Sequence, residues 1–398
     1  MKIGNMQDVD YSSFRMYLNS KSVSVVIDKD GIKYTPRKQL KYGTYKVRIN
    51  YKQNHKDISL EWEFNIVDKK DYKCYIGIPH SHTSYSGGKG TPSDAYKIAR
   101  ENKIDFLIVT EHYRILNKQV SKKAMSKVTT NNKFKDLDMY DLMRYEKKTF
   151  SKKNKKFLSL VGTEVPTKFY GHINVLNLDK NTHIDFRDIS KFYEYMSMNN
   201  GIGTINHPSD KISKKTLFKD LDRYLCLIEI GNGSYGTRYN TYENTVYELL
   251  DRGWILGVVN SQDNHLLNWG IPNNVTGVLL DKLKEDDLWD ALRNRRTYAT
   301  ESKTFKIKYY VNDYIMGSII EICSKDDIEV SLDMKDDENI IKSFDLITNN
   351  KKTIYHCDVN NKSYKGKFRI SVKDSRGWIL VKVILENNIK AYTSPIFY

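Results

Sequence analysis

The feature that most constrains the fold is a series of short apolar runs in the middle of the chain, each followed directly by a His or an acidic residue. The first run, residues 74–79, reads as a buried strand and ends in His80-Ser81-His82. In a strand, residues i and i+2 point the same way, so both imidazoles can face one ion. The series predicts a polynuclear metal site at the mouth of a barrel. The other five segments are residues 109–112, 161–164, 171–174, 205–208 and 261–265.

The region from about 72 to 300 alternates apolar strands with helices, which predicts βα units and a mostly parallel sheet. One helix is expected to begin at Thr91, with Pro92 at the first helical position and Asp94 in the first turn. Helices that end before Gly201 and Gly253 fit glycine at the C-cap. A last helix is expected around residues 286–295. The expected strands cover residues 104–109, 157–161, 172–178, 202–205, 224–230, 254–259 and 275–280.

The two ends of the chain have a different texture, in which polar and apolar residues alternate between turn signals. This is the pattern of antiparallel β-sandwiches. The charged residues 68–71 mark the first boundary. The expected domains are therefore an N-terminal β-sandwich over residues 1–70, a βα region over 71–301, and a C-terminal β-sandwich over 302–398.

The net charge of +16 is compatible with an anionic partner such as a phosphate ester, nucleic acid or a membrane surface, and equally with a lysine-rich coding bias. No apolar run approaches the ~20 residues that span a bilayer. The first residues lack the apolar core of a secretory signal. The four cysteines are far apart and form no Cys-x-x-Cys pair, so the sequence indicates neither a disulfide framework nor a thiolate zinc site. Cytoplasm is the expected compartment, without membrane association.

The strand-end residues are stronger evidence for a metal site together than each is alone. A single His at a strand end is more often a hydrogen-bonded structural residue than a metal ligand. An ordered series within one βα region is hard to reach by accident, and ligands from parallel strand ends converge on one face of a barrel. Imidazole and carboxylate are the ligands that zinc, manganese and iron accept. His55, His183 and His356 fall outside the series and are expected to be structural or exposed.

The ordered segments resemble the successive motifs of the PHP (polymerase and histidinol phosphatase) phosphoesterases over roughly residues 72–300. Residues 296–300 and 392–396 resemble the carbaryl-hydrolase-like branch, in which a β-sandwich follows the catalytic barrel. The resemblance implies an α/β protein with a distorted (β/α)7 barrel between N-terminal and C-terminal Ig-like β-sandwiches. The motifs that carry it are His80-Ser81-His82-Thr83, Thr110-Glu111-His112, Gly162-Thr163-Glu164, Gly171-His172-Ile173-Asn174, Asn206-His207-Pro208 and Asp263-Asn264-His265.

The resemblance also implies two or three divalent ions (Mn²⁺, Zn²⁺ or Fe²⁺) and a catalytic role for Glu164, Asp263 and His265. A carboxylate that bridges two ions lets them share a water, whose pKa falls from 15.7 to about 7 on metal binding. The resulting hydroxide would attack phosphorus. The implied ligands are His80, His82, Glu164 and Asp263 for the first ion, Glu164, His172 and His207 for the second, and His112 and His265 for the third.

The chain departs from the family pattern just after the first pair. Many members carry an acidic residue or a further His there to complete the shell of the third ion, but residues 83–89 hold neither. Lys89 could instead present its charge to a phosphate, and Glu111 stands where Asp is commoner. Further candidates for binding a substrate phosphate, because they follow metal segments or strand ends, are Arg114, Lys168, Tyr170 and Arg238.

The sequence leaves three functions open. The leading hypothesis is a metal-dependent hydrolase of phosphoric esters acting on a small phosphomonoester, a nucleotide or a nucleic-acid end, although no nucleic-acid-binding motif accompanies the charge. The first alternative is hydrolysis of carboxylic or carbamic esters, because a metal hydroxide attacks either kind of centre. The second alternative is a non-catalytic, polymer-binding module with the barrel as a scaffold.

Overall fold

In the computed structural model the chain divides into two compact units, Met1–Asp71 and Tyr72–Tyr398, and each has a hydrophobic core of its own. The described residues are 9–28, 31–36, 40, 43–66, 71–116, 118–120, 138–178, 186–212, 215, 221, 223–233, 239–320, 327–371 and 377–398.

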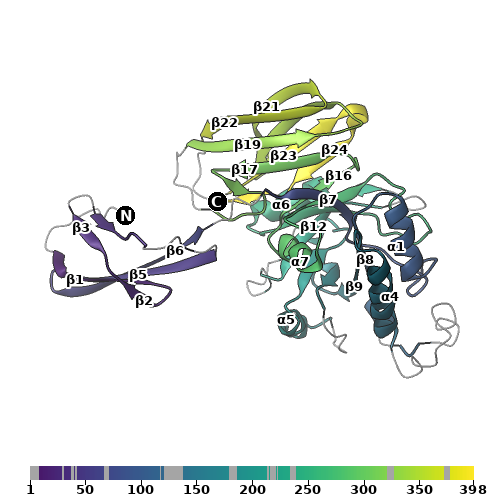
Figure 1. Cartoon of the computed structure of the whole chain (residues 1–398), viewed down its shortest axis with the longest axis horizontal. Helices are drawn as coiled ribbons and strands as arrows, with labels where there is room; N and C mark the ends of the chain where they lie inside the picture. The colour runs from purple at the N-terminus through teal and green to yellow at the C-terminus, as the bar shows by residue number, and fades with distance from the viewer. Residues whose placement is uncertain are drawn as a thin grey trace. The chain divides into compact units, whose positions relative to one another are not determined.

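The first unit contains a four-stranded antiparallel sheet in the order β2-β1-β5-β6 and a separate two-stranded hairpin of β3 and β4 (Figure 1). Asn54 and His55 both have positive φ angles, 50° and 63°, between the two long strands β5 and β6. Such a pair suits a tight hairpin turn, and His55 is exposed there, as expected. The sandwich arrangement stays a prediction. The strands are β1 Val9–Leu18, β2 Lys21–Val23, β3 Val26–Asp28, β4 Gly31–Lys33, β5 Gly43–Gln53 and β6 Lys56–Ile66.

The second unit is a mixed α/β structure with a large sheet and few helices (Figure 1). In its first part, β7, β8 and β9 are parallel, β10 returns as an antiparallel strand, and β11, β12 and β14 follow parallel to one another. The strand direction therefore agrees with the mostly parallel sheet that the sequence predicts. The bounds are β7 Lys73–Ile78, β8 Phe106–His112, β9 Leu158–Thr167, β10 Gly171–Leu176, β11 Ile202–Ile205, β12 Leu225–Asn232, β13 Asn240–Thr241 and β14 Gly257–Ser261.

The chain segments that follow β7 and β14 meet each other. The backbone N–H of His82 donates to Asn264 O at 2.9 Å, and the N–H of Asp263 donates to His80 O at 3.1 Å. These bonds form an isolated parallel bridge between Ser81 and Asn264. They bring the segments after β7 and β14 together at residues 80–82 and 263–265, the two motifs with the most potential metal ligands. Closure into a barrel stays a prediction.

Alternate side chains of β8 pack in two different hydrophobic cores. Phe106 and Ile108 belong to one buried cluster, and Leu107 and Val109 belong to another. Successive side chains of a strand point to opposite faces, so His112 continues the face of Phe106 and Ile108. The same parity on β9 places Glu164 on the face of Leu160. The register of β8 and β9 pairs His112 with Glu164, so these two polar side chains lie next to each other.

Helices lie at the positions expected from the sequence after Thr91, before Gly201, before Gly253 and near residues 286–295, and two further helices, in residues 113–116 and 139–153, were not predicted. The predicted start of α1 is confirmed, because Thr91 is the N-cap and forms a reciprocal capping box with Asp94, with Pro92 in the first turn. The helices are α1 Pro92–Glu101, α2 Tyr113–Leu116, α4 Met139–Lys153, α5 Ile189–Met198, α6 Glu243–Asp251 and α7 Glu285–Arg293.

Glycine has different roles after α5 and α6. Gly253 follows the C-cap of α6 with a φ of 86°, as predicted. After α5 the left-handed residue is Asn200, with a φ of 46°, so the prediction for Gly201 is wrong. Gly201 instead packs closely against Met196, because a Cβ there would lie 3.0 Å from Met196 Sδ.

The large sheet continues into the C-terminal part of the chain, because β16 pairs with both β15 and β24. A second, four-stranded sheet in the order β18-β17-β19-β22 shares a hydrophobic core with it. The predicted boundary at residues 301/302 therefore lies between strands that belong to one compact unit, and the three-domain division stays a prediction. The bounds are β15 Val275–Leu280, β16 Thr297–Thr300, β17 Lys306–Val311, β18 Tyr314–Ile315, β19 Asp327–Lys335, β20 Ile341–Thr348, η4 Asn349–Lys351, β21 Lys352–Asn361, β22 Ser363–Ser371, β23 Trp378–Leu385, η5 Glu386–Asn388, β24 Lys390–Thr393 and β25 Ile396–Phe397.

In the described ranges, no helix combines the length and the apolar character needed to cross a membrane.

Candidate metal centre

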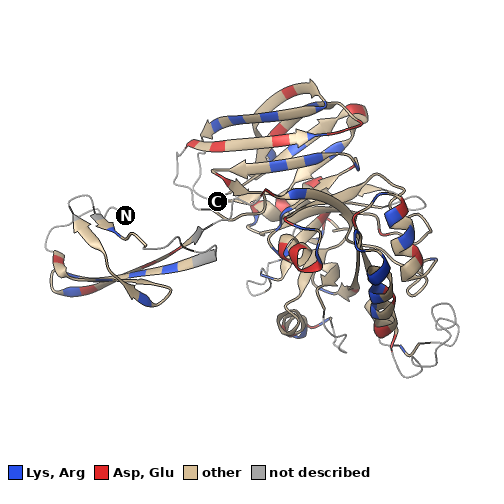
Figure 2. Cartoon of the chain, in the orientation of Figure 1, with Lys and Arg blue, Asp and Glu red and all other residues tan. Residues whose placement is uncertain are grey.

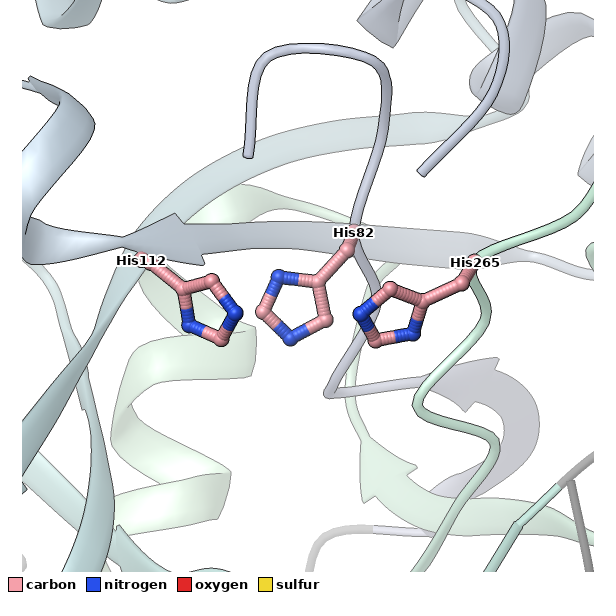
Figure 3. Close-up of side chains that lie close together, drawn as sticks. All are labelled: His82, His112 and His265. Atoms are coloured by element: carbon pink, nitrogen blue, oxygen red, sulfur yellow. The ribbon is translucent and has the colours of Figure 1, made fainter. Parts of the chain in front are cut away.

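The eight side chains that the sequence predicts as metal ligands lie together in three overlapping groups. Within each group the candidate ligand atoms all lie within 4.8 Å of one another. His82 belongs to two of the groups, and Figure 3 shows its ring between those of His112 and His265. Binding of metal ions by these groups stays a proposal. The groups are His80, His82 and Asp263; Glu164, His172 and His207; and His82, His112 and His265.

Glu164 occupies the middle of this arrangement and is buried, with a side-chain exposure of 2%. Its two carboxylate oxygens face different histidines. The amide of Asn206 also donates to Oε1 at 3.0 Å and so fixes the orientation of the carboxylate. The distances are 3.5 Å from Oε1 to His80 Nε2, 3.1 Å to His172 Nδ1 and 3.3 Å to His207 Nε2, and 3.4 Å from Oε2 to His82 Nε2 and 2.9 Å to His112 Nδ1.

Asp263 closes the first group from the loop after β14. Its Oδ1 lies 3.3 Å from His80 Nε2 and 3.2 Å from His82 Nε2, and the two imidazole nitrogens are 3.2 Å apart. Oδ1 is buried and has no hydrogen-bond partner in the described part of the chain. A buried carboxylate oxygen that accepts no hydrogen bond is costly, and a cation among these three donors would satisfy it. Asp263 also has a φ of 46°, a left-handed conformation of the kind found at functional sites.

The charges of the centre depend on one another. Burial opposes ionisation of Glu164, but the charge of His80 and hydrogen bonds from His112 and His172 hold the pKa of Glu164 well below its usual range. Burial also opposes the charged form of His207, yet the hydrogen bond to Glu164 raises the pKa of His207 to about 9. Without metal the carboxylates are therefore ionised, and His207 keeps a proton that a metal ion would displace.

Burial and neighbouring charges act on the first group in the same way. Burial raises the pKa of Asp263, but the charges of His80 and His82 more than reverse this effect and lower it. The pKa values of His80 and His82 are raised by the surrounding carboxylates against the opposing effect of burial. The first group is thus a set of mutually stabilised charges.

Glu229 of β12 is a residue of the centre that the sequence analysis missed. Its side chain is fully buried. Glu229 Oε1 accepts from His80 Nδ1 at 2.8 Å, and Oε2 accepts from the backbone N–H of His207 at 2.5 Å and from Asn232 Nδ2 at 2.7 Å. A carboxylate on one imidazole nitrogen fixes the tautomer, so Nε2 of His80 is left for the other members of its group. A lone acid within the apolar run 225–230 was the signal for it.

Glu111 belongs to none of the three groups, although its Oε2 lies 3.8 Å from His82 Nδ1. It is fully buried and accepts from the backbone N–H of Thr83 at 2.9 Å and from the hydroxyls of Thr83 and Ser86. The Ser86 hydroxyl also lies 3.1 Å from His82 Nδ1. Glu111 therefore holds the loop after His82, and Ser86 contacts the His82 ring in the segment where the sequence lacks a further acidic residue or His.

The predicted substrate-binding residues have different surroundings. Arg114 is exposed and lines a pocket of about 340 Å³ together with His112 and Glu164. Lys168 is exposed and lines a second pocket of about 410 Å³. Lys89 is exposed, and its backbone N–H donates to His265 O at 3.0 Å, which links its loop to the third group.

The other two predicted substrate-binding residues are Tyr170 and Arg238. The side chain of Tyr170 is buried and packs edge-on against Trp254, with the ring centroids 5.0 Å apart. Arg238 lies outside the described residues. Direct contact of either residue with a substrate stays a prediction.

No protein-family model matches the sequence, and no curated protein matches it. The chain is similar to the crystal structure of a two-domain protein from Bacteroides vulgatus, described as containing a predicted PHP-like metal-dependent phosphoesterase. The identity is 18%, the TM-score is 0.46, and the match covers 80% of this chain and 92% of that chain. A second match, the β-glucuronidase of Bacteroides uniformis, has 5% identity and a TM-score of 0.15, and covers 96% of this chain and 57% of that chain.

At these identities and TM-scores, neither likeness bears on the fold or the activity of this chain. The class of protein therefore rests on the residues themselves. The second unit is a mixed α/β structure whose clustered His, Glu and Asp side chains are compatible with metal binding.

Proposed function

We propose that the second unit is a metal-dependent phosphoesterase built on a (β/α)7 barrel, and that it hydrolyses a small phosphomonoester, a nucleotide or a nucleic-acid end. The observation that carries the proposal is the position of Glu164. One of its oxygens faces His172 and His207, and the other faces His82 and His112. A carboxylate placed in this way is suited to bridge two ions.

The donor atoms fit divalent metal ions. They are imidazole nitrogens and carboxylate oxygens, the ligands that Zn²⁺, Mn²⁺ and Fe²⁺ accept, and no Cys takes part in the three groups. The unpartnered Oδ1 of Asp263 is a further sign that a cation belongs in the first group. Two ions would be held by the first two groups, and a third by the group of His82, His112 and His265. When bound, such ions activate water at neutral pH and neutralise the oxygens of a phosphoester.

The other residues of the centre would orient the reacting groups. Glu229 fixes the ring of His80, and Asn206 fixes the carboxylate of Glu164. Arg114, in the pocket that contains His112 and His172, would pair with the oxygens of the ester. The burial of His80 and His82 shields the inner side of the centre, whereas the side chains of His172 and His207 are 44% and 31% exposed and leave the second group open to substrate.

The direct test is release of phosphate from p-nitrophenyl phosphate by purified protein loaded with Mn²⁺ or Zn²⁺. Turnover that disappears with a chelator and returns with metal is the expected result. Loss of metal without loss of activity, or no phosphate release from any of a panel of phosphoesters, would contradict the proposal.

A carboxylic or carbamic ester is the second candidate substrate. The pocket of Arg114 also contains Tyr113, Ile115 and Pro166, and this apolar wall suits an uncharged ester. Faster hydrolysis of p-nitrophenyl acetate than of p-nitrophenyl phosphate, with the same loaded protein, would favour this candidate. Fewer than one ion per chain after metal loading would favour the non-catalytic scaffold instead.

A further inference from the structure

The second pocket beside the metal centre has a strongly one-sided charge. It has a volume of about 410 Å³, and the residues that line it include Lys168, Lys211 and Lys215 together with His172 and His207. Among the described residues that line it there is no Asp or Glu. Elsewhere in this unit, Lys and Arg are interspersed with Asp and Glu on helices and strands (Figure 2). The pocket is therefore a local concentration of positive charge.

The three lysines are free to meet a ligand. Each is exposed, and within the ranges that the structure describes none of their ammonium groups has an ion-pair partner. Asp210 is next to Lys211 in the sequence but does not line the pocket. Its carboxylate accepts a hydrogen bond at 3.2 Å from the hydroxyl of Thr245, a residue of α6. Unpaired ammonium groups in a concave site favour an anionic ligand.

The pocket is directly connected to the candidate metal centre. His172 and His207, which form the second group with Glu164, belong to its lining. His172 also lines the pocket of Arg114 on the other side. A substrate whose ester lies at the metal centre would thus have Arg114 towards one pocket and the three lysines towards the other.

We propose that this lysine pocket binds a second phosphate group of the substrate, so that the preferred substrate is a bisphosphate with one phosphate at the metal centre and the other at Lys168, Lys211 and Lys215. This inference rests on the proposed phosphoesterase function and narrows its substrate class. The lysine ammonium is a compact point charge with three donors, which suits the oxygens of a terminal phosphate that is not itself cleaved.

The test compares two substrates with the same scissile ester, propyl phosphate and propane-1,3-diol bisphosphate, with metal-loaded full-length protein at low salt. The measured quantity is the ratio of kcat/KM for the bisphosphate to that for the monophosphate. We expect a ratio of roughly tenfold in the wild type, in keeping with three exposed charge pairs, and a ratio near one in the variant Lys168→Ala/Lys211→Ala/Lys215→Ala. The wild-type ratio should also fall as salt is added.

A matched variant, Lys97→Ala/Lys342→Ala/Lys352→Ala, removes the same charge from exposed positions outside the pocket and should keep the wild-type ratio. Equal kcat/KM values for the two substrates in the wild type, or an unchanged ratio in the pocket variant, would overturn the lysine pocket but leave the phosphoesterase intact. Hydrolysis of neither substrate would overturn this subsite, and the phosphoesterase would then be judged separately by the panel of phosphoesters.

Discussion

Among single residues, the candidate metal centre depends on side chains that contact the three groups without belonging to them. Glu229 accepts from His80 Nδ1, and Asn206 donates to Glu164 Oε1. Such partners fix the tautomer and the direction of a ligand before a metal ion arrives, which lowers the cost of binding. The residues that orient the candidate ligands therefore support a metal-binding role as much as the ligands themselves do.

The Glu229→Gln variant tests this role. Its amide keeps the size of the side chain but loses the charge that favours an Nδ1–H on His80. We expect metal affinity to fall about 10- to 100-fold, measured by competition with a chelating dye. Glu146→Gln is the matched control, because Glu146 is also a buried acid (1% exposed) but bonds to Tyr85 and Ser93. Equal losses of affinity in both variants would show that Glu229 acts only through stability.

Asp263→Asn tests the first group itself. The substitution removes the charge beside His80 and His82 and should lower turnover at least about 100-fold, with loss of bound metal and little change in secondary structure. The measurements are phosphate release, metal content and circular dichroism.

Asp345→Asn is the control for that variant. Asp345 accepts from His356 Nδ1 at 2.7 Å, so it is also an Asp–His pair, and its exposure of 24% is close to the 23% of Asp263. The control should keep its metal and its activity. Full activity of Asp263→Asn would mean that the first group is wrongly assigned.

At the scale of elements, register and parity decide which polar side chains meet. His112 and Glu164 are paired across β8 and β9, and both lie on the face that carries Phe106 and Leu160 deeper in the sheet. A shift of one residue in either strand would turn its ligand to the opposite face, where Leu107 and Val109 pack in the other core. The apolar contacts of these strands therefore also fix the site.

The start of α1 offers a prediction about stability. Thr91 accepts from the backbone N–H of Asp94, and Asp94 accepts from the backbone N–H of Thr91. Thr91→Ala removes half of this capping box and should lower the free energy of unfolding by about 0.5–2 kcal/mol, measured by urea denaturation. Thr91→Ser retains the hydroxyl and should stay within a few tenths of a kcal/mol of the wild type. Equal losses in both variants would contradict a capping role.

At the scale of the whole molecule, every residue of the three groups lies in the unit Tyr72–Tyr398. A protein that lacks residues 1–71 should therefore bind the same number of metal ions per chain with the same affinity as the full chain. Metal analysis after gel filtration and a dye-competition titration provide the measurement. Fewer ions in the shortened protein, with its circular dichroism spectrum retained, would show that the first unit contributes to the centre.

The charge of the centre predicts how stability depends on pH. The pKa of His207 is raised from 6.5 to about 9, so the stability that its protonated form provides is fully present below pH 6.5 and is lost as the pH rises through about 9. Metal binding requires the neutral imidazole, so its contribution increases over the same range. The difference in Tm between metal-loaded and metal-free protein should therefore grow from pH 6.5 to 9.

Thermal denaturation at several pH values, with and without a chelator, measures that difference. Calorimetric titration in buffers of different ionisation enthalpy should also detect protons released as metal binds. A difference in Tm that shrinks as the pH rises, or metal binding without proton release, would contradict this account of His207.

Much of the architecture could be predicted from local sequence patterns. The strands β11 and β15 have the predicted bounds, and the cap at Thr91 is confirmed. These features depend on neighbouring residues, so a local pattern suffices. The left-handed residue after α5 was misplaced at Gly201, because the glycine there serves close packing against Met196 rather than backbone conformation.

The sequence by itself determined which kinds of side chain could meet, since apolar runs ending in His or carboxylate residues recur in one βα region and define a donor set suited to divalent metal ions. Only the tertiary structure decided which of these side chains share a group. It placed His82 in two groups, turned Glu111 towards Thr83 and Ser86, and brought Glu229 to His80 from a strand 149 residues away. The physical reason is that local patterns fix the direction of a side chain along its own strand, whereas the pairing and register of distant strands fix its neighbours.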